Sequence, residues 1–158
     1  MVHKIPTYPN AKPVCQRLCP VHRRNAIAIK GEVEKLLKAG FIYPIPLTYW
    51  VSNIVPVTKK KGTIQFCVDY NDINDTCPKD NYLTPFIDKI INGCARSEIF
   101  SFKDVFSGYN KINIFPTDQH KTAFIYPLGN FAYKNLPFGL KNSDATFQRA
   151  MYYAFHGI

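Results

Sequence analysis

Asp104 is the residue with the clearest potential for chemistry, because it closes a strand-like run at residues 98–104. Carboxylate oxygens are hard ligands that suit Mg²⁺ and the phosphoryl transfer that such an ion supports. Ser107 and Gly108 follow, where backbone can approach a ligand closely because glycine has no side chain, and Tyr109 comes next. A lone aspartate at a strand end is also common as a turn or capping residue, and Tyr109 fits a core aromatic. Spacing alone leaves both interpretations open.

A run of three lysines, Lys59-Lys60-Lys61, precedes Gly62 between strand-like runs at residues 51–58 and 63–70. This pattern predicts a β-hairpin with a cationic tip, which can be either a solvated turn or a phosphate contact. Over the whole chain, 20 Lys and Arg stand against 11 acidic residues, giving a formal charge of +9. Such an excess favours a polyanionic partner such as nucleic acid, although other classes of basic protein share it.

The composition indicates a folded protein, because 46% of the 158 residues are hydrophobic and 15% are aromatic. We find no run apolar enough to span a bilayer and no signal peptide, so we expect an intracellular protein that is not secreted. The five cysteines lack a secretory context and are expected as free thiols. Cys15, Cys19 and His22 lack a fourth zinc ligand at finger spacing.

Several helices and strands are expected to position these residues. The first 24 residues, rich in proline and basic residues, predict an extended arm, followed by a helix that starts at Asn25 and stops near Gly40. Pro56 places the first strand of the hairpin at an edge or a bulge. The apolar face of the helix is expected to comprise Ala26, Ile29, Val33, Leu36 and Leu37.

Further along, the pattern predicts a short helix at residues 85–92, a strand at 98–104, a strand at 111–115 and a hairpin at 122–126 and 130–134. The last predicted element is a helix from about Ser143. Its expected buried stripe comprises Phe147, Ala150, Met151, Ala154 and Phe155. This order of elements predicts an α+β fold with a small antiparallel sheet.

Two ordered strings carry a resemblance to a known family. The first is Phe102-Lys103-Asp104-Val105-Phe106-Ser107-Gly108-Tyr109-Asn110-Lys111-Ile112. The second is Leu136-Pro137-Phe138-Gly139-Leu140-Lys141-Asn142 followed by Ala145-Thr146-Phe147-Gln148-Arg149-Ala150-Met151. Shorter matches are Val68-Asp69-Tyr70, Pro78-Lys79-Asp80-Asn81 and Lys121-Thr122-Ala123-Phe124. In this order they resemble the reverse transcriptase (RNA-directed DNA polymerase) of gypsy-class LTR retrotransposons, from about Lys12 to His156.

The resemblance implies the fingers and the first part of the palm of a right-hand polymerase, as a truncated domain over residues 1–158. Fingers are expected at residues 1–79 and 112–141, and palm at 80–111 and 142–158.

The resemblance also implies roles for single residues. Asp104 would be the catalytic carboxylate and, with the backbone carbonyl of Val105, would hold Mg²⁺ ions. Tyr109 would lie under the deoxyribose and exclude a 2′-hydroxyl, and Gln148 would face the template or the nucleotide. The incoming triphosphate would be contacted by Lys59, Ser107 and Gly108.

Four positions depart from the family pattern. Gln65 and Asn71 stand where the family has arginine, and glutamine cannot offer a charged bidentate fork to phosphate. Lys111 stands where glutamine is usual. Asp144 replaces a small residue or proline near the start of the last helix, where an acid suits the helix dipole but repels phosphate.

Three functions compete. The Asp-Asp strand hairpin that completes the two-metal site does not occur in these 158 residues, so we expect a reverse-transcriptase-like fragment of a retrotransposon polyprotein that is inactive alone. The alternatives are a basic module retained for nucleic-acid binding, or one part of a split polymerase completed by a palm and thumb polypeptide. In each case the expected partner is an RNA or DNA template–primer, with no membrane involved.

Overall fold

The computed structural model describes residues 1–58, 64–82, 86–95, 97–99 and 108–155. A five-stranded sheet forms the centre, with the strand order β2-β7-β6-β3-β4. In that order the strands are β2 (Ile42–Pro44), β7 (Gly129–Tyr133), β6 (Phe124–Tyr126), β3 (Ser52–Thr58) and β4 (Ile64–Val68). A separate parallel pair joins β1 (Val2–His3) to β5 (Asn113–Ile114).

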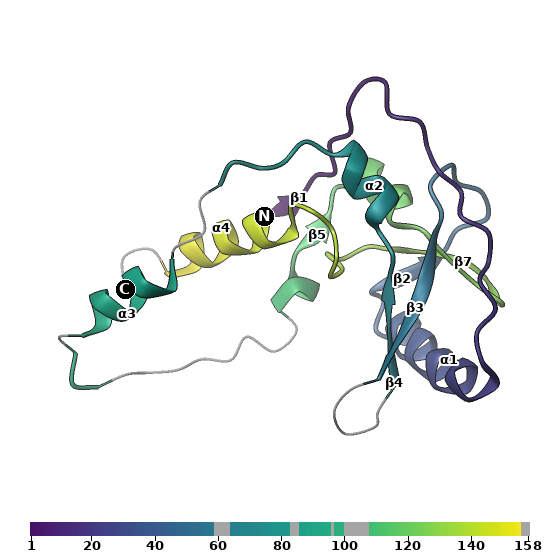
Figure 1. Ribbon diagram of the computed structural model, residues 1–158, viewed down its shortest axis with the longest axis horizontal. Coiled ribbons are helices and arrows are strands. Elements are labelled where there is room, and N and C mark those ends of the chain that lie inside the picture. The colour runs from purple at the N-terminus through teal and green to yellow at the C-terminus, as the bar shows by residue number, and fades with distance from the viewer. Residues whose placement is uncertain (59–63, 83–85, 96, 100–107, 156–158) are drawn as a thin grey trace.

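The described residues also form several helices. They are α1 (Arg23–Lys38), α2 (Asn71–Thr76), α3 (Ile87–Cys94), α4 (Ser143–Phe155) and two 3₁₀ helices, η1 (Gly108–Lys111) and η2 (Pro116–Thr122). α1 lies beside the sheet, whereas α3 lies at the far end of the molecule from the sheet (Figure 1). This arrangement confirms the predicted α+β fold class.

The β3–β4 hairpin is confirmed, with Ile54 opposite Val68 and Thr58 opposite Ile64. Its tip, residues 59–63, lies outside the described residues. β3 is internal in the sheet, but only the first two residues of β3, Ser52 and Asn53, pair with β6. Pro56 therefore has a neighbouring strand on one side alone, which is where a residue without an N–H is tolerated.

The sheet is antiparallel at three of its four strand junctions, and the hairpin of β6 and β7 is among them. β3 and β6 pair in parallel, with Ser52 opposite Phe124 and Asn53 opposite Ile125. The prediction of a small antiparallel sheet is wrong at this one junction, because the two strands come from distant segments and not from a hairpin.

α1 begins at Arg23, so the predicted start at Asn25 is wrong by two residues. The carbonyl of His22 accepts hydrogen bonds from the backbone N–H groups of Asn25 and Ala26, at 2.9 and 3.0 Å, which places Asn25 inside the first turn. The predicted stop is confirmed. Gly40 has φ 75°, and its N–H donates to Leu37 while that of Phe41 donates to Leu36, the paired bonds of a Schellman motif.

The apolar face of α1 is narrower than predicted. Ile29 and Val33 are fully buried and Leu36 packs against the core, but Leu37 is exposed. At 3.6 residues per turn Leu37 lies roughly 80° around the helix from Ile29, whereas Leu36 lies about 20° away.

The first residues are not a free arm, which corrects the prediction for the N-terminus. His3 and Ile5 are 3% exposed, and β1 pairs with β5. The backbone is extended, as predicted, but Ile5 belongs to the hydrophobic core and His3 is buried. Residues 14–16 hydrogen-bond to Val51 as the segment continues along the sheet.

The second half of the chain brings further corrections. α3 extends two residues past the predicted end at residue 92, and Pro85 lies outside the described residues. Glu98 and Ile99 are not in a strand, and the rest of the predicted strand at 98–104 lies outside. The predicted strand at 111–115 shortens to β5, because η1 takes its first residue and Phe115 immediately precedes η2.

α4 starts at Ser143 as predicted, but its buried stripe differs. The buried positions are Ser143, Ala145 and Thr146. Of the predicted stripe, Phe147 and Ala150 are partly buried against the core, whereas Ala154 and Phe155 are exposed. The first turns of α4 contact His3 of β1 and Tyr109 of η1. Among the described residues, the core is centred on Ile29, Ile42, Tyr70, Ile73, Ile114, Phe124 and Leu136, all under 3% exposed.

Candidate functional site

The predicted site residues divide into two groups. Those outside the described residues are Lys59, Asp104, Val105 and Ser107. Those that the structure places are Gly108, Tyr109 and Gln148. Among the described residues, no group of three or more His, Cys, Asp or Glu side chains is arranged to hold a metal ion.

Tyr109 belongs to the first matched string and contacts two residues of the second. It belongs to η1, and its ring stacks on Phe147 of α4 with centroids 4.6 Å apart and an interplanar angle of 10°. Phe138, from the segment before α4, packs on the same ring at 4.5 Å with a tilt of 45°. The structure thus brings Tyr109 of the first string into direct contact with Phe138 and Phe147 of the second string.

The hydroxyl of Tyr109 donates a hydrogen bond to Oδ1 of Asp144 at 2.7 Å. Burial, followed by the hydrogen bond to Asp144 and the charge of Asp144, raises the pKa of Tyr109 to about 12. Tyr109 therefore stays protonated and remains a donor at neutral pH. Both interpretations of Asp144 from sequence omitted this contact, which becomes visible only when η1 and α4 are placed together.

Gly108 and Gln148 flank this aromatic cluster in the chain. Gly108 is buried at the start of η1. Gln148 is half-buried and follows Phe147 on α4, so it leaves the helix axis about 100° away from the ring that stacks on Tyr109. The two matched strings supply residues to one region, with Gln148 on an adjoining side of α4.

A second constellation was not predicted from sequence. Arg149 donates two hydrogen bonds to the carboxylate of Asp80, each at 2.6 Å, and its guanidinium lies 4.6 Å from the centroid of the Tyr82 ring. The hydrogen bonds from Arg149 hold the pKa of Asp80 below its ordinary value. Bidentate pairing of this kind fixes both partners in orientation, so the Tyr82 ring has a rigid support on one face.

The segment before α4 is tied to residues 78–80. Asn142 accepts a hydrogen bond from the backbone N–H of Asp80 and donates one to the carbonyl of Pro78, both at 2.9 Å. The Nζ of Lys141 donates to the carbonyls of Asn74 and Cys77. The signal available in the sequence was that Asp80, Asn142 and Arg149 all fall within matched strings, but their pairing was not deducible from it.

These tied segments border a cavity of about 540 Å³. Its lining combines cations, aromatic rings and polar groups: Lys79, Asp80, Asn81, Tyr82, Phe86, Lys141, Asn142, Asp144 and Ala145. Phe86 is 66% exposed. Basic side chains beside accessible aromatic rings are the combination that binds single-stranded nucleic acid.

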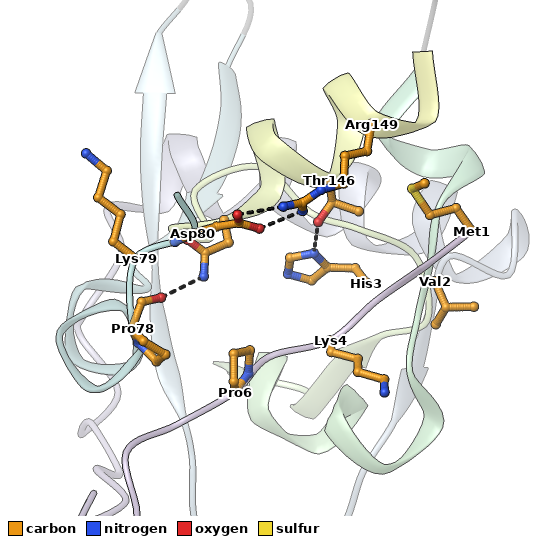
Figure 2. A pocket seen from close by; sticks show the side chains of 11 residues that line it. Met1, Val2, His3, Lys4, Pro6, Pro78, Lys79, Asp80, Thr146 and Arg149 are labelled. Carbon is orange, nitrogen blue, oxygen red and sulfur yellow. Dashed lines mark hydrogen bonds and ion pairs between the residues drawn. The ribbon is translucent and has the colours of Figure 1, made fainter. Parts of the chain in front are cut away.

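A second cavity, of about 380 Å³, lies between the N-terminal residues, residues 78–80 and α4. Figure 2 shows His3 pointing to Thr146 and the side chain of Arg149 reaching Asp80. His3 Nδ1 is 2.7 Å from Thr146 Oγ1, and burial lowers the pKa of His3 to about 4. The neutral imidazole thus anchors β1 to the first turns of α4.

Residues 57–158 match the family model described as reverse transcriptase (RNA-dependent DNA polymerase). The chain belongs to the reverse transcriptase family. It is 32% identical, over 147 residues, to the retrovirus-related Pol polyprotein from transposon gypsy of Drosophila melanogaster. That alignment covers 89% of this reverse transcriptase chain and 14% of the relative.

Solved reverse transcriptases share the fold. The native crystal structure of prototype foamy virus protease-reverse transcriptase aligns with a TM-score of 0.82 at 24% identity, covering 99% of this chain and 21% of that one. A foamy viral protease-reverse transcriptase in complex with RNA/DNA hybrid aligns with a TM-score of 0.80 at 22% identity, covering 94% and 20%. These findings confirm the predicted family and the predicted fold.

One finding bears on membranes. Within the described parts of the chain, every helix is too short or too polar to cross a bilayer.

Proposed function

We propose that this chain is the part of a retrotransposon reverse transcriptase that binds the template and the incoming deoxynucleoside triphosphate, and that it does not extend a primer by itself. The observation that carries the proposal is the contact of Tyr109 with Phe138 and Phe147. This contact joins the aspartate string to α4, as a shared nucleotide site requires. Fingers at residues 1–79 and 112–141 and palm at 80–111 and 142–158 remain part of the proposal.

In this proposal the nucleotide lies against Tyr109. The tyrosine ring meets the deoxyribose, and the backbone at Ser107 and Gly108 contacts the triphosphate. Lys59 supplies a positive charge to the phosphates from the hairpin tip. Gln148 faces the base or the template from the adjoining side of α4. Gly108 has no side chain to obstruct the proposed approach of the backbone to the phosphates.

The cavity of about 540 Å³ is proposed to take the template strand. Lys79 and Lys141 bring positive charge to its wall, and the rings of Tyr82 and Phe86 can stack on bases. Arg149 is neutralised by Asp80, so its contribution is to support Tyr82 rather than to bind phosphate. The foamy viral relative in complex with RNA/DNA hybrid supports a nucleic-acid partner.

Mg²⁺ is the proposed cofactor, with Asp104 and the carbonyl of Val105 as its ligands from this chain. The bound metal would stabilise charge on the phosphates during in-line displacement. Oxygen donors of this kind suit Mg²⁺, but two-metal chemistry needs further carboxylates. These 158 residues contain no Tyr-x-Asp-Asp-type string, and on this ground we propose inactivity of the chain alone.

Binding to a labelled template–primer tests the proposal. We expect affinity without sequence preference that falls steeply as salt rises, because phosphate contacts release counterions. Tyr82→Ala is expected to weaken binding by about 1–3 kcal/mol through loss of stacking. Tyr43→Ala is the matched control, since Tyr43 lies in β2 outside the cavity.

Two outcomes would contradict the proposed template site. One is binding that does not change between low and high salt. The other is an equal loss in the Tyr82→Ala and Tyr43→Ala variants. Salt-dependent binding to nucleic acid with no binding of nucleoside triphosphate would favour the alternative of a retained nucleic-acid-binding module, which the net charge of +9 supports.

A further inference from the structure

Asp144 and Phe147 act on the same tyrosine from one face of α4. They are three residues apart, so their side chains leave the helix on the same side. Phe147 stacks on the ring of Tyr109, while Asp144 accepts the hydrogen bond from its hydroxyl at 2.7 Å. Phe147 therefore contacts the apolar ring of Tyr109, and Asp144 contacts its polar hydroxyl group.

Together these contacts restrict Tyr109 more than stacking does alone. Two stacked rings can slide over one another at little cost, because offset arrangements are similar in energy. Phe138 packs on the ring as well, and the hydrogen bond to a carboxylate fixes the position of the hydroxyl. The ring is therefore held at three points, two of them from α4 and one from the segment before it.

The protonation state of Tyr109 agrees with this arrangement. The pKa of Tyr109 is raised to about 12 by burial first and by Asp144 second, so the phenol keeps its proton through the neutral range. Asp144, which accepts the bond, is an exposed residue.

We propose that Asp144 is a positioning residue that holds Tyr109 in place and thereby sets the preference of this chain for deoxyribose over ribose. The inference rests on the proposed function, in which Tyr109 lies against the sugar of the bound triphosphate. A ring that cannot move aside clashes with a 2′-hydroxyl, whereas a ring free to slide yields to it. Selectivity by a clash requires the clashing group to be rigid.

The competing explanation is that Asp144 only stabilises α4. An acid in the first helical turn interacts favourably with the helix dipole. That role depends on the negative charge, whereas the positioning role depends on an oxygen that accepts a hydrogen bond. Asp144→Asn removes the charge and keeps the acceptor, and Asp144→Ala removes both, so the two variants separate the roles.

The experiment measures dissociation constants of the full chain for dATP and ATP in the presence of Mg²⁺, and takes their ratio. We expect Asp144→Ala to lower the preference for dATP about fivefold, which is about 1 kcal/mol. Asp144→Asn should keep the preference within about twofold. Tyr109→Phe removes the donor and leaves the α4 charge intact, so it should lower the preference as much as Asp144→Ala, and the double variant should lower it no further.

Asp88→Ala is the matched control, because Asp88 is an exposed acid in the first turn of α3, and its ratio should equal that of the unchanged chain. An unchanged ratio in Asp144→Ala, or an equal loss in Asp144→Asn, would overturn this inference while leaving nucleotide binding in place. Failure of the unchanged chain to bind either triphosphate would instead overturn the proposed nucleotide site, and this inference with it.

Discussion

His3 shows how much one buried side chain near the N-terminus contributes to the architecture. The residue is 3% exposed. Its Nδ1 forms a hydrogen bond with Oγ1 of Thr146, a residue 143 positions away in the sequence. Asp118 and Asp80 act on it electrostatically and raise its pKa, but desolvation outweighs them and leaves the pKa at about 4. A neutral imidazole in the folded chain has a direct consequence for stability.

We predict that the chain loses stability between about pH 6.5 and pH 4 because of His3. The unfolded state takes up a proton near the ordinary histidine pKa of about 6.5, while the folded state resists protonation down to about 4. The stability that His3 contributes is therefore complete above pH 6.5 and declines as pH falls, by up to about 3 kcal/mol. Urea denaturation at a series of pH values measures it.

The control for this prediction is a second histidine. His3→Asn should flatten the decline in stability between pH 6.5 and 4. His22→Asn, at an exposed position, should leave this decline unchanged. An equal slope in the unchanged chain and in His3→Asn would show that other groups cause the decline.

At the scale of single elements, α1 and the β3–β4 hairpin carry strong local signals. The alternation of the second hairpin strand is confirmed, since Ile64, Phe66 and Val68 are less exposed than Gln65 and Cys67. Gly40 ends α1 with a positive φ of 75°. Gly31 also belongs to α1, but it lies in the interior of the helix. A Cβ added at Gly31 would meet no atom within 4 Å.

We predict opposite effects of the same substitution at these two glycines. Gly40→Ala should destabilise the chain by about 1 kcal/mol, because an L side chain disfavours the left-handed conformation. Gly31→Ala should stabilise it by roughly 0.5–1 kcal/mol, because alanine loses less conformational entropy in a helix. Denaturant unfolding of the two variants measures both changes. Shifts of the same sign would contradict the C-terminal role of Gly40.

At the scale of the whole molecule, the second half of α4 presents large side chains to solvent. Tyr152 is 58% exposed, Tyr153 72% and Phe155 46%, while the first turns of the helix are buried. The alignment with the gypsy polyprotein covers only 14% of that relative. The question at this scale is therefore what these 158 residues can do alone.

We predict no measurable nucleotide incorporation by the 158-residue chain on any primer–template, with Mg²⁺ or Mn²⁺. In-line displacement needs two metal ions about 3.5–4 Å apart, and one aspartate, Asp104, is the carboxylate that the family pattern assigns here. Primer extension with purified protein measures it, with Asp104→Asn as the control. Extension that disappears in Asp104→Asn would overturn the prediction. Extension restored by a separate polypeptide bearing an Asp-Asp strand hairpin would support the split-polymerase alternative.

The sequence by itself determined the family, the fold class and the elements with strong local patterns. The ordered strings are a property of the chain alone, and so are the β3–β4 alternation, the stop at Gly40 and the start of α4 at Ser143. These features depend on interactions between near neighbours in sequence, such as helix capping and strand periodicity. The roles proposed for Lys59, Asp104, Val105 and Ser107 rest on sequence, because those residues lie outside the described ones.

Only the tertiary structure decided which distant residues meet. The hydrogen bond of Tyr109 to Asp144, the pairing of Arg149 with Asp80 and the burial of His3 against Thr146 all join separate segments. The same applies to exposure, since Phe147 and Ala150 of the predicted α4 stripe pack against the core, whereas Ala154 and Phe155 are exposed. Periodicity shows which residues share a face, but the burial of that face depends on elements that pack against it from elsewhere in the chain.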